Sequence, residues 1–150
     1  NPVTIRCEPF NQTKTAKLLG VYIDNHISFN EQVSSVIEKS HSAVHGLLTL
    51  KRHSVINYLF VQFYCARNLP ILTYATSSWL NYTTNYSRNA LEWHQTLCLR
   101  IIYPTIRSYS ERCEIANVLA VKHHFTQICS FYAIKVINNK VILQSNLNCI

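Results

Sequence analysis

The spacing of apolar residues constrains the fold of this chain more than any other feature of its sequence. From residue 28 onward, apolar side chains recur every three or four positions, beginning with Val33, Val36, Ile37, Val44 and Leu47. This spacing places them along one face of an α-helix. The chain has 150 residues, 48% of them hydrophobic, which suffices for one sizeable core. We therefore predict a mainly α-helical bundle of about five or six helices, forming one compact domain or a piece of one.

Local signals predict where these helices begin and end. Ser28-x-x-Glu31 and Ser108-x-x-Glu111 match the capping box, in which the serine accepts a hydrogen bond from a first-turn amide and the glutamate reaches back. The predicted helices run from near Phe29 to Lys51–His53, from Ser54 to Pro70, from Pro70 through Trp79, from the polar break at 81–85 to Pro104, from Ser108 through Leu119, and through Phe125 to Asn138-Asn139. Pro70 either stops the second helix or restarts it as the third. Aromatic residues at helical spacing are predicted to belong to the core, namely Phe60, Phe63, Tyr64, Tyr74 and Trp79.

Two short β-favouring runs precede the helices. Residues 3–6 and 18–23 are separated by the polar stretch 11–15. The simplest interpretation is a short antiparallel β ribbon formed by these two runs. Because a two-stranded ribbon is marginally stable alone, we expect it to pack on a helix or to belong to a larger sheet.

Composition excludes several classes of function. Gly20 and Gly46 are the only glycines, so the chain cannot carry a dinucleotide fingerprint or a glycine-rich phosphate loop. Asp24 is the only aspartate, and the six glutamates are scattered, so a two-metal polymerase or nuclease centre cannot be assembled from this chain alone. The net charge of +7 favours a polyanionic partner, with nucleic acid ahead of a membrane surface. The alternative is a basic surface that binds nothing.

Cysteine and histidine patterns do not indicate a metal site. The six cysteines are widely spaced without a CxxC motif, which favours a reducing compartment and argues against a zinc ribbon. His41 and His45 stand one helical turn apart, but no third ligand lies nearby. The sequence shows no secretory or membrane signal, and polar residues interrupt the apolar stretch 55–80. We expect an intracellular chain, in the nucleus or the cytoplasm and not secreted, that neither holds a metal nor contacts a membrane.

Several motifs follow one another along the chain in a set order. They are Lys17-Leu-Leu-Gly-Val-Tyr-Ile-Asp24, Ile27-Ser-Phe29, Leu47-Leu-Thr-Leu-Lys-Arg52, Leu69-Pro-Ile-Leu-Thr-Tyr74 with Trp79, and Leu91 followed by Gln95-x-x-x-Leu99-Arg-Ile-Ile102. Their order resembles the segment that follows the catalytic motifs in reverse transcriptases of non-LTR (LINE-type) retrotransposons. The resemblance covers residues 3 to about 135. Where that family often has a glycine after Pro-x-x-x-Tyr, this chain has Ala75.

The resemblance implies a division of the chain and a set of site residues. Residues 1–27 would be the end of the palm with its primer-grip ribbon, residues 28–138 a helical thumb-like region, and residues 139–150 a tail or truncated connection. Carried over by position, the primer grip would be Lys17, Leu19, Gly20 and Val21. A physical reason supports this independently, because a glycine lets a backbone approach another chain closely and Lys17 can neutralise a phosphate. The alternative is that Gly20 marks a bulge in a packed strand.

The helical candidates for phosphate contact are Lys39, Lys51 and Arg52, since a thumb helix needs charge rather than groups that read bases. The alternative is that these cations form an ordinary solvated face. The resemblance implies an RNA/DNA template–primer duplex as partner, together with the missing palm and fingers of the same polypeptide. Mg²⁺ would be bound by the aspartates of that missing palm, so this fragment alone should be inactive. The rival interpretation is a catalytically inert helical protein-interaction module or a degenerate retrotransposon relic.

Overall fold

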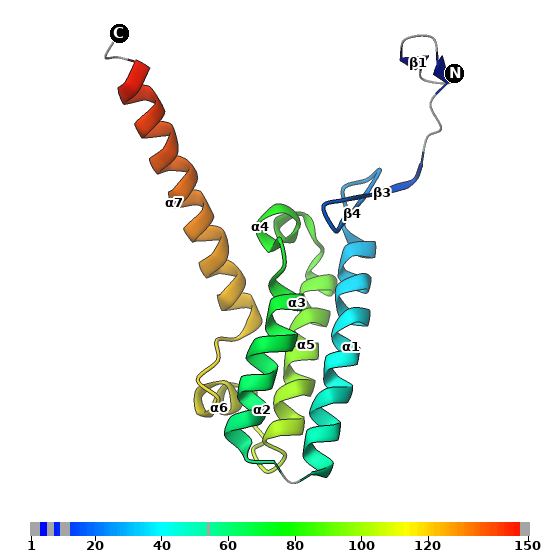
Figure 1. Cartoon of the computed structure of the whole chain (residues 1–150), viewed down its shortest axis with the longest axis vertical. Helices are drawn as coiled ribbons and strands as arrows, with labels where there is room; N and C mark the ends of the chain where they lie inside the picture. The colour runs from blue at the N-terminus through cyan, green and yellow to red at the C-terminus, as the bar shows by residue number, and fades with distance from the viewer. Residues whose placement is uncertain (1–3, 6–7, 10–12, 54, 148–150) are drawn as a thin grey trace.

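The computed structural model describes residues 4–5, 8–9, 13–53 and 55–147 and shows a mainly helical protein with short antiparallel strands before the helices. This confirms the predicted fold class. The strands are β1 (Thr4–Ile5), β2 (Glu8–Pro9), β3 (Thr15–Leu18) and β4 (Val21–Asp24). The helices are α1 (Asn30–Arg52), α2 (Asn57–Phe63), the π-helix η1 (Tyr64–Asn68), α3 (Leu69–Thr73), α4 (Thr76–Trp79), the 3₁₀-helix η2 (Leu80–Tyr82), α5 (Asn85–Ile102), α6 (Tyr109–Ile115) and α7 (Val121–Leu147) (Figure 1).

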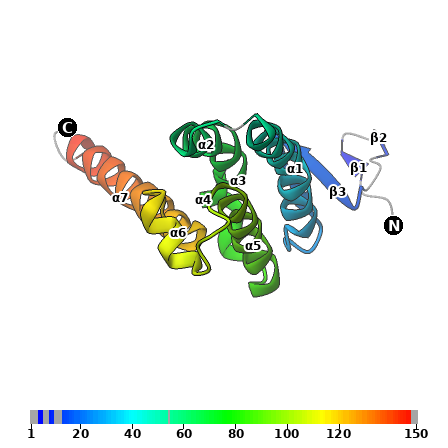
Figure 2. The same ribbon diagram turned by 90° about the horizontal axis from the view of Figure 1, so that it is seen from below.

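The bundle is built from α1, the run α2–η1–α3, and α5, which pack against one another. Figure 2 shows α6 and α7 on one side of these helices and β3 on the other. The core divides along the bundle into two clusters of buried side chains. Near the hairpin it contains Val21, Phe29, Val33, Val36, Leu72, Trp79, Leu80, Leu91, Val121 and Phe125. Near the far end it contains Leu47, Phe60, Tyr64, Cys98, Leu99, Ile102, Cys113 and Ala116.

The helical run through Pro70 differs from the prediction. Pro70 neither stops nor restarts a helix, because α2, η1 and α3 follow one another without a break from Asn57 to Thr73. The π-helix η1 ends at Asn68, two residues before the proline, and contains Ala66, whose carbonyl the proline ring would meet in a regular α-helix. The helix ends at Thr73 instead, because the backbone of Tyr74 is extended and Ala75 has a φ of 51°. Tyr74 and Ala75 therefore do not share a helix with Trp79.

The β ribbon is also paired differently from the prediction. Residues 18–23 do not form one strand against 3–6; β3 pairs with β4, and β1 pairs with β2. The reason lies in the turn residues. Leu19 and Gly20 both have positive φ, 48° and 84°, which is the conformation of a tight two-residue hairpin turn. The glycine therefore reverses the chain inside the run that was expected to be continuous.

The start of α1 is within one residue of the predicted position, but Ser28 is not its cap. The N-cap is Phe29 in a left-handed conformation. The carboxylate of Asp24 accepts hydrogen bonds from the Ser28 amide, the Ser28 hydroxyl and the Phe29 amide. Glu31 does not reach back to the cap and accepts a hydrogen bond from the Thr15 hydroxyl instead. A full negative charge is a stronger acceptor than a serine hydroxyl, and the hairpin places that charge beside the start of α1.

The ends of the later helices were predicted with mixed success. Ser108 caps α6 and accepts from the Glu111 amide, as predicted. That helix ends at Ile115 rather than at Leu119, because Asn117 turns left-handed with a φ of 51°. The predicted stop at Asn138-Asn139 is wrong, since α7 continues to Leu147. Asparagine only weakly disfavours a helix, and neither glycine nor proline follows it there. The predicted cap Ser54 and residues 148–150 of the predicted tail lie outside the described residues.

The last helix leaves the bundle. Its first turns pack on α4 and α5, and Figure 1 shows the remainder extending away from the other helices. Every side chain from Ser130 to Asn139 is exposed. Within the described part of the chain, no helix combines the length and the apolar character needed to cross a bilayer.

Candidate functional site

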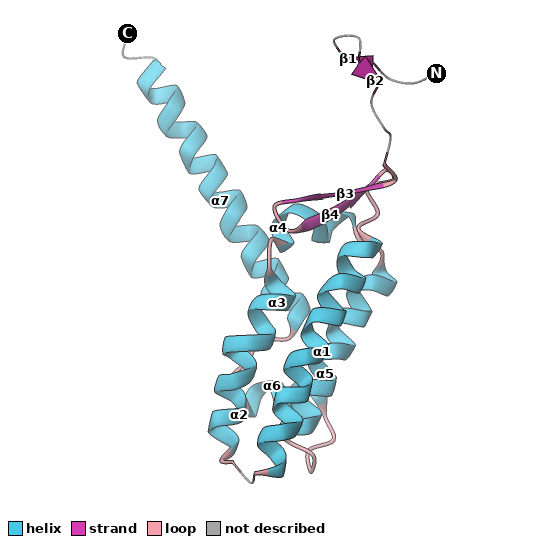
Figure 3. Cartoon of the chain, turned by 45° about the vertical axis from the view of Figure 1, so that its right-hand side comes forward, coloured by secondary structure: helices cyan, strands magenta, loops and turns pink. Residues whose placement is uncertain are grey.

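The β3–β4 hairpin, which contains the predicted grip residues, lies across the start of α1 (Figure 3). The Tyr22 amide donates a hydrogen bond to Oε1 of Gln32 at 3.0 Å, and Gln32 is only 2% exposed. The Asp24 carboxylate then ties the end of β4 to the loop before α1. The amide of Ser28 contributes most to lowering the pKa of this carboxyl to about 2, against the opposing effect of partial burial. The base of the hairpin is therefore fixed to the helix by hydrogen bonds.

The tip of the hairpin is held by a tyrosine that is distant in the sequence. The Tyr74 hydroxyl donates to the Leu19 carbonyl at 2.8 Å. A Cβ on Gly20 would lie 3.5 Å from the Tyr74 ring, so the close approach at this glycine is made by a side chain of the same protein. The prediction of Tyr74 as a core residue is wrong, because its side chain is 54% exposed.

The four predicted grip residues do not share one environment. Lys17 is exposed, and its Nζ lies 4.9 Å from the centre of the Tyr22 ring, within cation–π distance. Leu19 is 85% exposed at the tip, and Gly20 forms the turn beside it. Val21 is only 8% exposed and packs in the core. Lys17 and the tip are thus open to a partner, whereas Val21 anchors the hairpin.

The other predicted core aromatics are placed as follows. Phe60, Tyr64 and Trp79 are buried, and Phe63 is half-buried. The Phe63 ring packs against Gly46 of α1, where a Cβ would lie 2.5 Å from the ring. Gly46 therefore permits a close approach between α1 and α2.

The predicted helical cations do not form one cluster with the hairpin. Lys39, Lys51 and Arg52 are all exposed on α1. Lys51 and Arg52 occupy the last turn of α1, about 30 Å along the axis from its start, where the hairpin packs. Lys39 and Lys51 point about 120° apart around the axis at 3.6 residues per turn. The positive charge of α1 is therefore spread along and around the helix.

His41 and His45, which the sequence does not favour as a metal site, lie one turn apart on α1. Both side chains are exposed. In the ranges that the structure describes, no group of three histidine, cysteine or acidic side chains could hold a metal ion. The His41 ring instead stacks on buried His94 of α5, with ring centres 5.5 Å apart.

His94 forms a polar contact inside the bundle that sequence patterns did not reveal. Its Nε2 lies 2.6 Å from the Ser40 hydroxyl oxygen, and its Nδ1 has no partner among the described residues. Burial, with a smaller contribution from nearby His41, lowers the pKa of His94 to about 4. Both Ser40 and His94 are fully buried, so this pair is closed to a substrate and joins α1 to α5.

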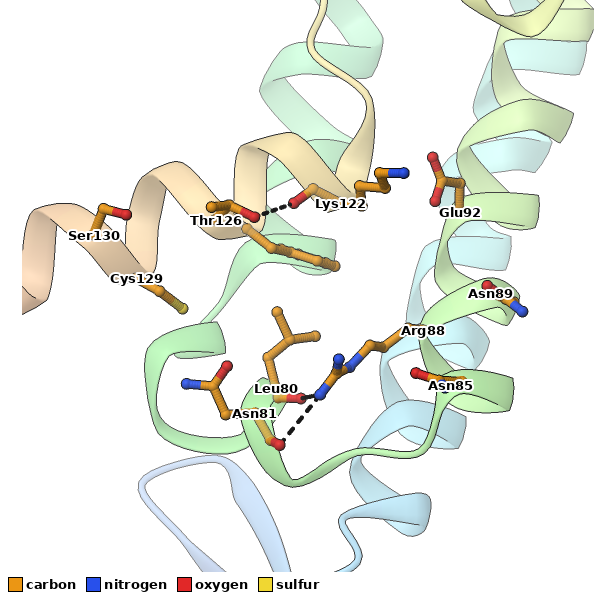
Figure 4. A pocket seen from close by; sticks show the side chains of 11 residues that line it. Leu80, Asn81, Asn85, Arg88, Asn89, Glu92, Lys122, Thr126, Cys129 and Ser130 are labelled. Atoms are coloured by element: carbon orange, nitrogen blue, oxygen red, sulfur yellow. Dashed lines mark hydrogen bonds between the residues drawn. The ribbon is translucent and has the colours of Figure 1, made fainter.

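A second site missed from the sequence is a cleft between α5 and α7 (Figure 4). Its volume is about 480 Å³, within the range of small-molecule sites. The lining residues come from three stretches of chain: 80–81, 85–92 and 122–130. No local pattern joins them, so periodicity and motif spacing could not have identified the cleft. We refer to it below as the α5–α7 cleft.

No family model, curated protein or solved structure matches this chain.

Proposed function

We propose that this chain holds a template–primer duplex through phosphate contacts, as the end of the palm and the thumb of a non-LTR retrotransposon reverse transcriptase. The proposal implies a chain that works inside the cell, in the nucleus or the cytoplasm. In this proposal the catalytic aspartates and their Mg²⁺ belong to a palm and fingers outside this chain, so the chain positions nucleic acid and performs no chemistry alone.

The observation that carries the proposal is the exposed basic hairpin. Lys14 and Lys17 are both exposed on β3 or directly before it, beside a tip that is open to solvent. Tyr74 and Gln32 hold this hairpin at its tip and in its second strand. A backbone held in this way can meet a sugar-phosphate chain without first becoming ordered, and ordering opposes binding. Charge supplies the affinity, in agreement with the net charge of +7.

The spread of cations along α1 is compatible with a duplex. The hairpin and the pair Lys51 and Arg52 are separated by about 30 Å along α1. A duplex presents the same strand again after one helical turn, which is about 34 Å in the B-form and somewhat shorter in the A-like form of an RNA/DNA hybrid. We propose that these two basic ends contact one backbone about one helical turn apart. Lys39 points to a different side of α1 and would contribute only by long-range attraction.

The test is an equilibrium titration of an RNA/DNA hybrid by fluorescence anisotropy at several salt concentrations. We expect the logarithm of the association constant to fall linearly with the logarithm of salt concentration, with little dependence on base sequence. The double variant Lys14→Gln/Lys17→Gln should reduce the slope by about two. The control is Lys135→Gln, which removes one positive charge from the exposed part of α7 and should leave the slope unchanged. Binding without salt dependence, or equal slopes in the wild type and the double variant, would refute the proposal.

A second candidate function, a protein-interaction module, is favoured by the exposed part of α7. Phe131, Ile134 and Ile137 are 66%, 58% and 60% exposed. Apolar residues in such number on one free helix are typical of a surface that another protein covers. If this candidate is correct, Phe131→Gln/Ile134→Gln should abolish binding of a protein partner and leave the anisotropy titration unchanged. Loss of duplex binding in that variant would argue against it.

A further inference from the structure

The α5–α7 cleft combines groups that are not used by the proposed duplex contacts. One wall is the start of α5 with Arg88, the opposite wall is the start of α7 with Lys122, and the η2 turn closes one end. Figure 4 shows Arg88 reaching from α5 toward the η2 turn, and Lys122 and Glu92 facing each other from opposite walls. The cleft is separate from the β3–β4 hairpin, since neither β3 nor β4 contributes a lining residue.

Hydrogen bonds hold the Arg88 guanidinium in place and use only two of its three nitrogens among the described residues. Its Nη2 donates to the carbonyls of Leu80 and Asn81, at 3.2 Å each, and its Nε donates to the Thr83 hydroxyl at 3.4 Å. Its Nη1 has no hydrogen-bond partner among the described residues. A planar guanidinium that is fixed by its other nitrogens presents these remaining donors in a set direction, which suits the oxygens of a phosphate.

The remaining charges leave the cleft net positive. Lys122 supplies a second cation from α7, and Glu92 is the only acid in the lining. No ion pair joins Lys122 to Glu92 in the part of the chain described. A phosphate near Arg88 and Lys122 would therefore meet two cations, while Glu92 remains an acceptor for a hydroxyl or amino group.

Amide side chains and an apolar floor complete the lining. Asn85 and Asn89 lie one turn apart on α5, and Asn81 belongs to the η2 turn. None of these three amide groups hydrogen-bonds to another described residue. Each can donate and accept at once, as the edge of a nucleobase requires. Leu80 and Phe125 form the floor of the cleft as buried core side chains, 7% and 3% exposed, so they shape the cleft without offering a free face to a base.

We propose that the α5–α7 cleft binds a nucleoside phosphate. The phosphate is bound by Arg88 and Lys122, the edge of the base meets the asparagines, and Glu92 accepts from a ribose hydroxyl. The ligand is either a free mononucleotide or an unpaired nucleotide of a longer strand. The inference does not depend on the hairpin or on the proposed duplex contacts.

A cysteine in the lining provides the readout. Cys129 lines the cleft, whereas Cys65 is exposed outside it. We would alkylate the native full chain with iodoacetamide in the presence of AMP, of single-stranded oligonucleotide, or of fully paired duplex, and measure modification of each cysteine by peptide mass spectrometry. We expect AMP or the single strand to slow modification of Cys129 and to leave Cys65 unchanged. Protection by AMP indicates a free mononucleotide, and protection by the single strand alone indicates an unpaired nucleotide.

Variants decide whether the protection arises in the cleft. Lys122→Gln and Asn89→Leu should each weaken the ligand about fivefold, as judged by the concentration that half-protects Cys129. The control Lys135→Gln makes the same charge change on the exposed part of α7, outside the lining of the cleft, and should leave that concentration unchanged. The proposal is overturned if neither AMP nor the single strand protects Cys129, if only paired duplex does, or if all three variants behave alike. None of these results depends on the salt slope that tests the proposed function.

Discussion

Acidification should weaken the fold through His94. The Ser40 hydroxyl donates to the Ile37 carbonyl at 3.0 Å, so the hydrogen between Ser40 and His94 is placed on Nε2 of the histidine. The neutral ring then has a bare Nδ1, and protonation would put a charged donor there. No acceptor faces this atom among the described residues, and the only titratable ring stacked on it is that of His41.

The magnitude follows from the two pKa values of His94. The unfolded chain takes up the proton near pH 6.5, whereas the folded chain holds His94 neutral down to about pH 4. Between these values the unfolded state binds more protons, so the free energy of unfolding falls as the pH falls. The slope reaches about 1.4 kcal/mol per pH unit, which makes the loss on the order of 3 kcal/mol over the whole window. The pKa of Asp24 is lowered to about 2, so its stabilising contribution is lost only below about pH 3.8, outside this window.

The assay is urea unfolding followed by tryptophan fluorescence at a series of pH values from 7.5 to 4.5, with buried Trp79 as one reporter. His94→Gln keeps a side chain that can donate to Ser40 but cannot titrate, so its unfolding free energy should depend far less on pH across this range. His123→Gln removes an exposed histidine and should behave as the wild type does. The reasoning is refuted if the wild type and His94→Gln lose stability in parallel.

Three further predictions concern backbone and packing. Gly46→Ala places a Cβ 2.5 Å from the Phe63 ring and should lower the free energy of unfolding by about 1–3 kcal/mol. In a Phe63→Leu background the same change should be neutral or stabilising. An equal loss in both backgrounds would contradict the steric explanation. Ala75→Gly should raise the free energy of unfolding by up to about 1 kcal/mol, because a φ of 51° disfavours any side chain. Urea unfolding would measure this change, and a lower urea midpoint in the variant would show that the alanine is not strained. Tyr74→Phe removes the hydrogen bond to the Leu19 carbonyl. It should speed amide hydrogen exchange in β3 and β4 about fivefold without changing exchange in α5. Unchanged exchange in β3 and β4 would mean that the hydroxyl does not hold the hairpin.

Much of the fold could be predicted from local patterns. The recurrence of apolar residues predicted the helices, and the serine cap of α6 was predicted because donor and acceptor lie within one turn. The predictions of helix ends failed where another interaction outweighed the local sequence signal. Ser28 lost its role as cap to Asp24, which the hairpin brings to the same loop. At Pro70 the π-helical turns of η1 removed the expected break.

The candidate sites could be predicted only in part. Lys17 and Leu19 are exposed, but Tyr74, which holds the tip, is 55 residues away in the sequence. The different directions of Lys39 and Lys51 follow from their spacing of twelve residues within the predicted helix, so the sequence could have excluded a common face for them. The α5–α7 cleft draws on three separate stretches of chain, and no pattern within any one of them indicates the others.

The sequence by itself determined that this protein is helical and basic, since these properties follow from the spacing and the number of residues of each type. Tertiary structure alone decided which polar groups meet. The contacts of Tyr74 with Leu19, of Ser40 with His94, and of Arg88 with the η2 turn depend on how the hairpin and helices pack. A hydrogen bond acts only within about 3 Å, and distances of that size between remote segments are set by packing of the core.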